Sequence, residues 1–177
     1  LIRNYDTNVF EKLNINDLIF SSYPTITKSG FYNNYEFIVK NSNSDSENSS
    51  NYKEGDNVYL STLFQYNSTL PLIKDDNKYQ KILKPKASLK LAPPHTKNQK
   101  SNNTKIDVNN IFALNRDFEE DSIEGGVSLA YGSDYSIINK KNRREIFNFK
   151  VANNIRIEEN DDLPTNNQLG QKTSNFF

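Results

Sequence analysis

The sequence predicts an all-β fold, a section of an antiparallel up-and-down transmembrane β-barrel with about five long strands and long extracellular loops. Three observations support this prediction. Short runs alternate apolar and polar side chains, clusters of Asn, Ser, Asp and Lys separate these runs, and the runs reach about 10–14 residues, longer than usual soluble strands. Strands of that length with one apolar face suit a bilayer.

The composition indicates ordered strands separated by very polar linkers. Hydrophobic residues make up only 34% of the 177 residues, yet 10 Tyr and 11 Phe argue against a disordered chain. The 22 basic and 22 acidic residues balance, so no concentrated basic face for nucleic acid is expected. The sequence has no cysteine, which excludes disulfides and thiolate metal sites, and no apolar stretch is long enough for a transmembrane helix.

Two candidate strands occupy the first half of the chain. Residues 31–40 alternate imperfectly between an apolar and a polar face. Residues 58–67 alternate clearly, with Leu60 and Phe64 on one face and polar residues among those on the other. Residues 15–20 are apolar enough for a short strand, but the pattern is too brief to assign one.

The run at residues 83–91 has the strictest alternation in the chain. Its leucines share one face, and Lys84, Lys86 and Lys90 share the other. In a barrel these lysines would face the lumen, where a cationic row could attract the phosphates and acidic sugars of a passing glycolipid, although lumen faces are generally polar. Pro85 has no N–H to donate to a strand ladder, so we expect a bulge or weakened pairing there.

Two further candidate strands follow at residues 127–137 and 147–157, with aromatic side chains near their ends that suit membrane interfaces. Long and short linkers alternate between the five runs. In order they are residues 41–57, 69–80, 93–123, 139–144 and 158–174. Short links can join only antiparallel neighbours, so the long linkers should share one edge of the sheet, outside the cell. Residues 93–123 should form one long excursion, with a helical turn near residues 109–114.

Other residues with chemical potential are interpreted as structural. His95 lies in a proline-containing polar stretch without a Ser or Cys partner at readable spacing. The acidic runs at 119–121 and 158–162 could bind divalent cations, but solvated loops explain them more simply, and neither has EF-hand spacing. Gly125 and Gly126 lack the surroundings of a phosphate loop and should permit a bend or bulge entering a strand. We therefore expect no catalytic residue, cofactor or metal.

Three segments together resemble a known family. They read LKPKASLKLAP at residues 83–93, NNIFALNR at 109–116 and DSIEGGVSLAYGSDY at 121–135. In order and spacing, this series resembles the barrel domain of the lipopolysaccharide-assembly family LptD, in particular its alphaproteobacterial members. The residues that carry the resemblance are Pro85, Phe112, Asn115, Arg116, Asp121, Glu124, Tyr131 and Gly132. The stretch DFEEDS at 117–122 departs from many members.

The resemblance implies a large single-chain barrel in the outer membrane of a Gram-negative bacterium, with residues 1–177 as an internal part truncated at both ends. It implies that the complete protein inserts lipopolysaccharide (LPS) into the outer leaflet through a seam between its first and last strands. The implied partners are LPS, outer-membrane lipid, an LptE-like plug lipoprotein inside the barrel and the periplasmic Lpt bridge. The chain matches neither the jellyroll domain of the family nor its seam.

Three alternatives remain open from the residues alone. A porin or receptor barrel would show the same strand pattern, and only the motif series favours LPS assembly over it. A secreted soluble β-sandwich that binds a ligand would pack its apolar face on a second sheet. An enzyme is the least favoured, because no nucleophile, base and oxyanion grouping can be assembled from these residues.

Overall fold

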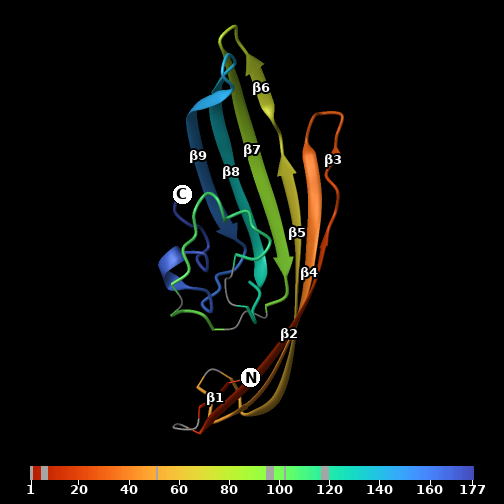
Figure 1. The fold of residues 1–177 in the computed structure, drawn as a ribbon, viewed down its shortest axis with the longest axis vertical. Coiled ribbons are helices and arrows are strands. Elements are labelled where there is room, and N and C mark those ends of the chain that lie inside the picture. Colours follow the sequence, from red (N-terminus) through yellow and green to blue (C-terminus); the bar gives the residue numbers. More distant parts are fainter. Residues whose placement is uncertain (1, 5–7, 51, 95–97, 102, 117–119) are drawn as a thin grey trace.

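The computed structural model contains one antiparallel sheet, which is shown in Figure 1. It describes residues 2–4, 8–50, 52–94, 98–101, 103–116 and 120–177. The strands pair in the order β1-β2-β4-β5-β7-β8-β9, with β3 beside β4 and β6 beside β7. The strands are β1 (Ile2–Asn4), β2 (Val9–Ser21), β3 (Thr25–Ile26), β4 (Tyr32–Glu47), β5 (Gly55–Thr69), β6 (Leu72–Asp75), β7 (Tyr79–Ala92), β8 (Gly126–Asn139) and β9 (Arg144–Arg156). One 3-10 turn, η1 (Thr165–Asn167), lies near the C-terminus.

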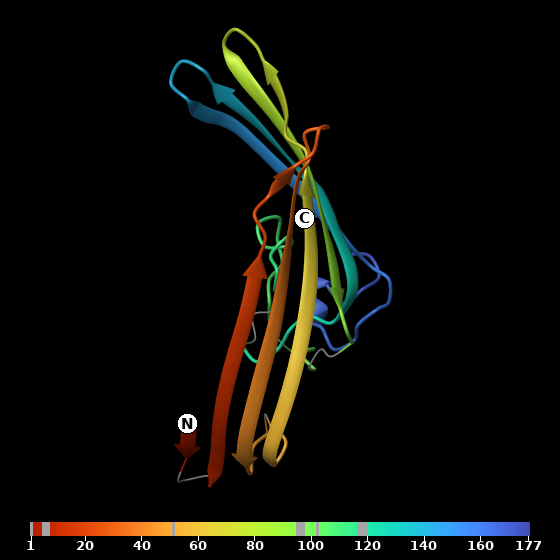
Figure 2. The same ribbon diagram turned by 90° about the vertical axis from the view of Figure 1, so that its right-hand side faces the viewer.

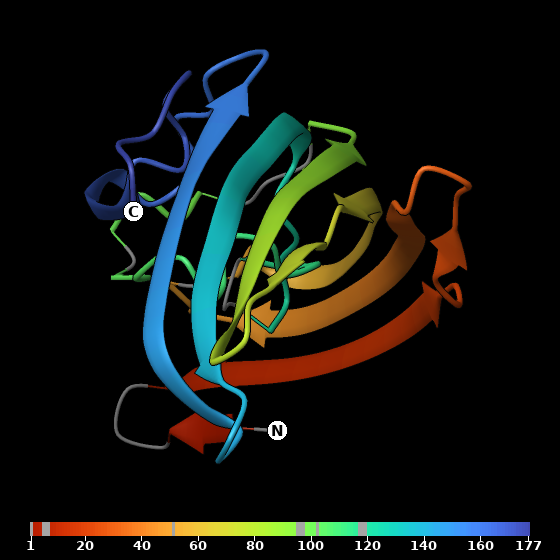
Figure 3. The ribbon, with the colours of Figure 1, turned by 90° about the horizontal axis from the view of Figure 1, so that it is seen from above.

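The sheet is curved and staggered. Seen from above, its strands lie along an arc (Figure 3). Seen from the side, β2, β4 and β5 reach one end of the molecule, whereas the hairpins of β7, β8 and β9 reach the other (Figure 2). Within the described residues, β1 and β9 do not pair with each other, so this sheet is open. A tilted, curved, single-layer sheet is the geometry of a barrel wall.

All five strands predicted from alternation are present, and each is longer than predicted or of similar length. The antiparallel up-and-down arrangement is confirmed, because every pair of neighbouring strands is antiparallel. The links 48–54, 93–125 and the segment after β9 therefore leave one end of the strands. The links 22–31, 70–78 and 140–143 leave the other end.

The prediction of a linker over residues 41–57 is wrong for most of that range. Strands β4 and β5 stay paired as far as Ser46 and Gly55, which leaves only a short turn. Both faces of this hairpin carry mainly Asn, Ser and Asp, so no apolar alternation marked it as a strand. β2 is also longer than the unassigned apolar run at residues 15–20. Its first half is paired with the polar part of β4 in the same hairpin.

The weakened pairing expected at Pro85 is present on one side of β7. β5 ends opposite Lys86, and β6 resumes opposite Leu83, so the ladder is interrupted beside Pro85. Pro71 lies in this interruption and also lacks an N–H. On the other side of β7 the ladder to β8 is continuous. Pro85 lies opposite Ser133, and the register does not shift before or after this pair.

The register separates an apolar outer face from a polar inner face. One row across five strands is wholly apolar and consists of Phe20, Phe37, Phe64, Leu91 and Val127. The adjacent row on the opposite face consists of Glu36, Gln65, Lys90, Ser128 and Arg156. Large apolar side chains stay exposed on the outer face, where Tyr35 is 46% and Leu89 37% exposed. The arrangement is inside-out relative to a soluble protein and suits an outer face in lipid.

The chain outside the strands folds back against the inner face. Two small apolar clusters hold it there, one around Ile111 and Leu163 over the small residues Ala130 and Ala152, and one around Ile123. In the described part of the long link between β7 and β8 there is no strand. His95 and Glu119 lie outside the described residues. No helix in the described part of the chain is long and apolar enough to cross a membrane.

Candidate functional site

The candidate site is the place where residues 105–116 rest on the polar inner face. This segment begins with a turn in which Asp107 and Asn110 hydrogen-bond each other's backbone N–H groups. The Asp107 carboxylate also accepts from the N–H of Asn109 at 2.7 Å, and this bond lowers the pKa of Asp107. The Ile111 N–H donates to the Asp107 carbonyl, so residues 107–111 form a single tight turn.

Arg116 ends this segment and is fully buried. Its Nε and Nη2 donate to the two carboxylate oxygens of Glu124 at 2.8 and 2.5 Å. Its Nη1 donates to Asn154 on β9 at 2.8 Å, and Nη2 also donates to Ser128 on β8 at 2.9 Å. The planar guanidinium thus joins the link to two strands through geometry that only arginine provides.

Glu124 lies in the link just before β8 and accepts from a second arginine. Arg156, at the end of β9, donates Nη1 to Glu124 at 2.6 Å and Nη2 to the Gly125 carbonyl. Burial alone would raise the pKa of Glu124, but the positive charges of Arg116, Lys90 and Arg156 outweigh it and lower that pKa to about 2. The carboxylate therefore stays ionised at any physiological pH.

Sheet side chains also bind the backbone carbonyls of the segment. Lys90 is 1% exposed and donates Nζ to the carbonyls of Ala113 and Leu114, the latter at 2.9 Å. Gln65 donates to the Phe112 carbonyl at 2.9 Å. These carbonyls point away from any ladder, so the side-chain donors supply partners that buried backbone acceptors require. Further along the link, Lys40 on β4 donates to the carbonyl of Glu120 at 2.6 Å.

The three lysines predicted to form one row lie on the same face of β7 but in different surroundings. Lys90 is enclosed beneath the segment. Lys86 is half-buried, pairs with Asp134 on β8 and lies 5.5 Å from the centre of the Phe112 ring. Lys84 is exposed. Of the three, Lys84 lies on the part of the inner face that the segment leaves uncovered, and Lys86 lies at the edge of this part beside Phe112.

The residues that carried the family resemblance separate into two groups. Phe112, Asn115, Arg116 and Glu124 meet at the site, with the Asn115 amide 3.4 Å from the Ser122 carbonyl. Gly132 also faces inward, where an added Cβ would lie 2.3 Å from the carbonyl oxygen of Val151. The others lie apart, Pro85 beside the interrupted ladder, Asp121 half-buried in the link and Tyr131 on the outer face.

The glycines at the start of β8 have a local structural role. Gly126 has φ +88°, a conformation that favours glycine, and bends the chain as it enters β8. A Cβ there would lie 2.7 Å from Nη2 of Arg156. The expected bend is therefore present, and it leaves the space in which Arg156 reaches Glu124.

Sequence reasoning missed Arg156, Asn154, Ser128 and Gln65 as members of the site. Period-2 alternation could have placed each of them on the inner face. It could not have shown that Arg116, which lies in a link, would meet residues from two different strands.

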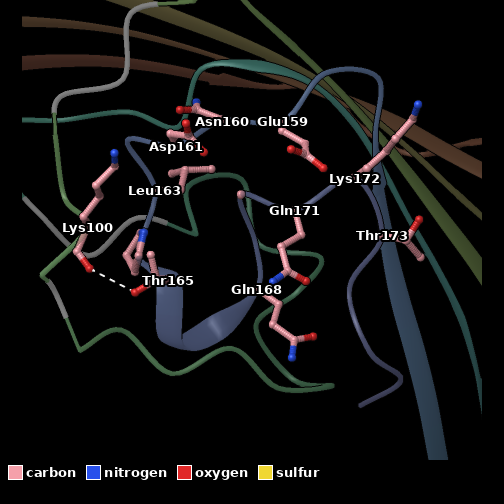
Figure 4. A pocket seen from close by; sticks show the side chains of 12 residues that line it. Lys100, Glu159, Asn160, Asp161, Leu163, Thr165, Gln168, Gln171, Lys172 and Thr173 are labelled. Atoms are coloured by element: carbon pink, nitrogen blue, oxygen red, sulfur yellow. Dashed lines mark hydrogen bonds between the residues drawn. The ribbon is translucent and has the colours of Figure 1, made fainter.

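A surface cavity of about 660 Å³ adjoins the site near the C-terminus (Figure 4). Side chains of both charges line it, including Lys100, Glu159, Asp161 and Lys172, together with the amides of Gln168 and Gln171. Two residues of the second acidic run therefore border this cavity. No group of three or more potential metal ligands occurs in the described residues.

The arrangement as a whole is an anchor. Its charged groups bind each other or the backbone of the segment, and it joins the long link to β5, β7, β8 and β9. A search of curated proteins finds no match to the chain. The family model for LptD, described as LPS transport system D, matches residues 17–177. These residues span nearly the whole chain, and the chain therefore belongs to the LptD family, LPS transport system D.

Proposed function

We propose that the chain is an internal section of the wall of an outer-membrane barrel that delivers LPS to the outer leaflet of a Gram-negative bacterium. The inverted distribution of polar and apolar side chains is the observation that carries this proposal. An exposed row of aromatic and aliphatic residues covers the outer face, and a polar row lies directly behind it. The membership of the LPS transport family supplies the substrate class.

The length of the apolar band agrees with a membrane wall. On β8 the outward residues run from Val127 to Ile137, and on β9 from Phe147 to Val151 and Ile155. A transmembrane strand needs about 9–11 residues to cross the hydrocarbon layer at the usual tilt. The alternative of a soluble sandwich would need a second sheet on this apolar face, and the described residues form one sheet.

The anchored segment occupies the inner face at the end of the long links, which we assign to the cell exterior. The inner face toward the short turns stays uncovered; Lys84 lies there beside Asp134, and Lys86, which pairs with Asp134, lies at the edge of the segment. We assign to these two lysines contact with the phosphates of LPS as it enters the barrel. An LptE-like lipoprotein inside the barrel and the periplasmic Lpt bridge would complete the translocon.

Site-specific photocrosslinking in the full-length protein tests this function. A photoreactive residue at Lys84 should capture LPS in growing cells, because this side chain faces the uncovered lumen. Lys81 is the matched control, since it lies three residues away on the outer face of the same strand. LPS adducts at both positions, or at neither, would contradict transport along this inner face. A porin would give no LPS adduct at Lys84.

A further inference from the structure

The hairpin of β4 and β5, together with β2, forms a polar hollow on the outer face. Its volume is about 400 Å³. Two register rows supply the outward side chains around it. They are Lys12, Asp45 and Asp56 in one row, and Asn14, Asn43 and Val58 in the next. The hollow lies toward the end of the sheet from which the long links leave. The ends of β2, β4 and β5 that carry its residues are at the bottom of Figure 2.

An asparagine ladder continues from this hollow along the same face. Asn16 lies opposite Asn41, and Asn14 lies opposite Asn43. The Asn43 amide donates to the Asn41 side-chain oxygen at 2.6 Å, and Asn16 donates to Asn14 at 3.4 Å. Asparagine is disfavoured in strands, so four neighbouring outward asparagines need a reason beyond strand stability.

The charged row of the hollow lacks internal pairing. Lys12 lies opposite Asp45, and Asp45 lies opposite Asp56. No ion pair or hydrogen bond joins these three side chains to any described residue, even though like charges directly opposite each other destabilise a sheet. Carboxylates, an ammonium group and amides that face an open hollow are the donors and acceptors that bind sugar hydroxyls.

The same strands turn apolar immediately beyond the ladder. The row after Asn16 and Asn41 contains Leu18 and Val39, and the next contains Phe20 and Phe37. Leu18 is 67% and Phe20 53% exposed. A ligand that covers both zones must itself be an amphiphile, with a hydroxyl-rich head and a hydrocarbon tail.

The geometry points to a binding site for the sugar head group of an LPS molecule resident in the outer leaflet. Its head group occupies the hollow and the asparagine ladder, and its acyl chains lie against the apolar rows beyond. This inference rests on the proposed function for the membrane and its side. It concerns a lipid held outside the barrel, whereas transport concerns LPS inside it.

Binding of a deacylated LPS oligosaccharide to the delipidated full-length protein in detergent tests the inference. The double variant Asn14→Ala with Asn43→Ala removes two amides that border the hollow, and the loss of their hydrogen bonds should weaken binding about tenfold. Asn33→Ala is the matched control, because it also faces outward on β4 but at the opposite end of the sheet. Native mass spectrometry gives the bound fraction for each protein.

The wild type and the Asn33 variant should bind the oligosaccharide alike, and the double variant should bind less of it. Equal binding by all three proteins, or equal loss in both variants, would overturn the inference. Surface delivery of LPS should be unchanged in the double variant. The two proposals can therefore fail separately. Absence of an LPS crosslink at Lys84 would refute transport along the inner face, and the oligosaccharide measurement alone decides the site on the outer face. Heat-modifiable migration on gels verifies that each variant has folded.

Discussion

Replacing Glu124 by Gln should release residues 105–116 from the inner face while the strands stay paired. Glutamine keeps the shape of the side chain but removes the negative charge that lies among Arg116, Arg156 and Lys90. Three buried cations would then face each other without this counter-charge. The segment depends on these contacts, whereas the strands also have their own ladders.

The size of the effect follows from the pKa of Glu124. The fall from its ordinary value of 4.5 to about 2 corresponds to about 3 kcal/mol of preferential stabilisation of the charged form. Removing one partner of a buried ion pair costs about 3–5 kcal/mol in other proteins, which is consistent. The opening of the segment should therefore become about 100-fold more frequent.

Hydrogen exchange measured by mass spectrometry on the full-length barrel reads this opening directly. The amides of Ile111 and Ala113 are hydrogen-bonded within the segment and should lose protection by that factor. Asp75→Asn is the control, because Asp75 pairs with Lys140 and accepts a hydrogen bond from Gln80, and both interactions are exposed and lie far from the segment. Protection of Ile111 and Ala113 within twofold of the wild type in the Glu124 variant would refute the anchor.

Three further predictions concern the same region. The pKa of Glu124 lies below its unfolded value, so its stabilisation is complete above about pH 4.5 and should fade toward pH 2, seen as faster proteolysis of residues 105–116. Glu124→Gln should remove most of this pH dependence and leave the part that comes from Asp107, whose pKa is also lowered. Gly132→Ala should lower the folded fraction on heat-modifiable gels, since its Cβ would lie 2.3 Å from the Val151 carbonyl oxygen. Gln65→Leu should lower the free energy of opening at Ile111 by about 1 kcal/mol in exchange experiments, because the Phe112 carbonyl loses its donor.

Much of the fold could be predicted because lipid imposes a period of two. In strands such as β8, every second residue faces a single apolar environment, so the alternation from Val127 onward is strong enough to read. The β4–β5 hairpin escaped prediction because polar side chains occupy both of its faces at the far end, and even the buried positions Ser42, Ser44 and Ser46 are polar. Where Asn41, Ser42 and Asn43 follow each other, burial alternates but hydropathy does not, and the pairing with β2 and β5 makes the segment a strand.

The site was only partly predictable, for a different reason. The sequence motifs identified Arg116 and Glu124 as family residues, but the contacts of Glu124 with Arg116 and Arg156 depend on tertiary structure. Arg156 is separated from Glu124 by two complete strands. A pattern with a period of two indicates which face a side chain occupies and carries no information about which link will fold onto that face.

The anchor explains why three separated motifs occur together. The first motif contributes Lys90, which binds the carbonyls of the second motif. The second contributes Arg116, and the third contributes the carboxylate of Glu124 that neutralises it. None of these groups is stable alone in a buried place, because an isolated buried charge is far more costly than a paired one. The three motifs are therefore parts of one interaction, and a change in any of them leaves the other two with uncompensated buried groups.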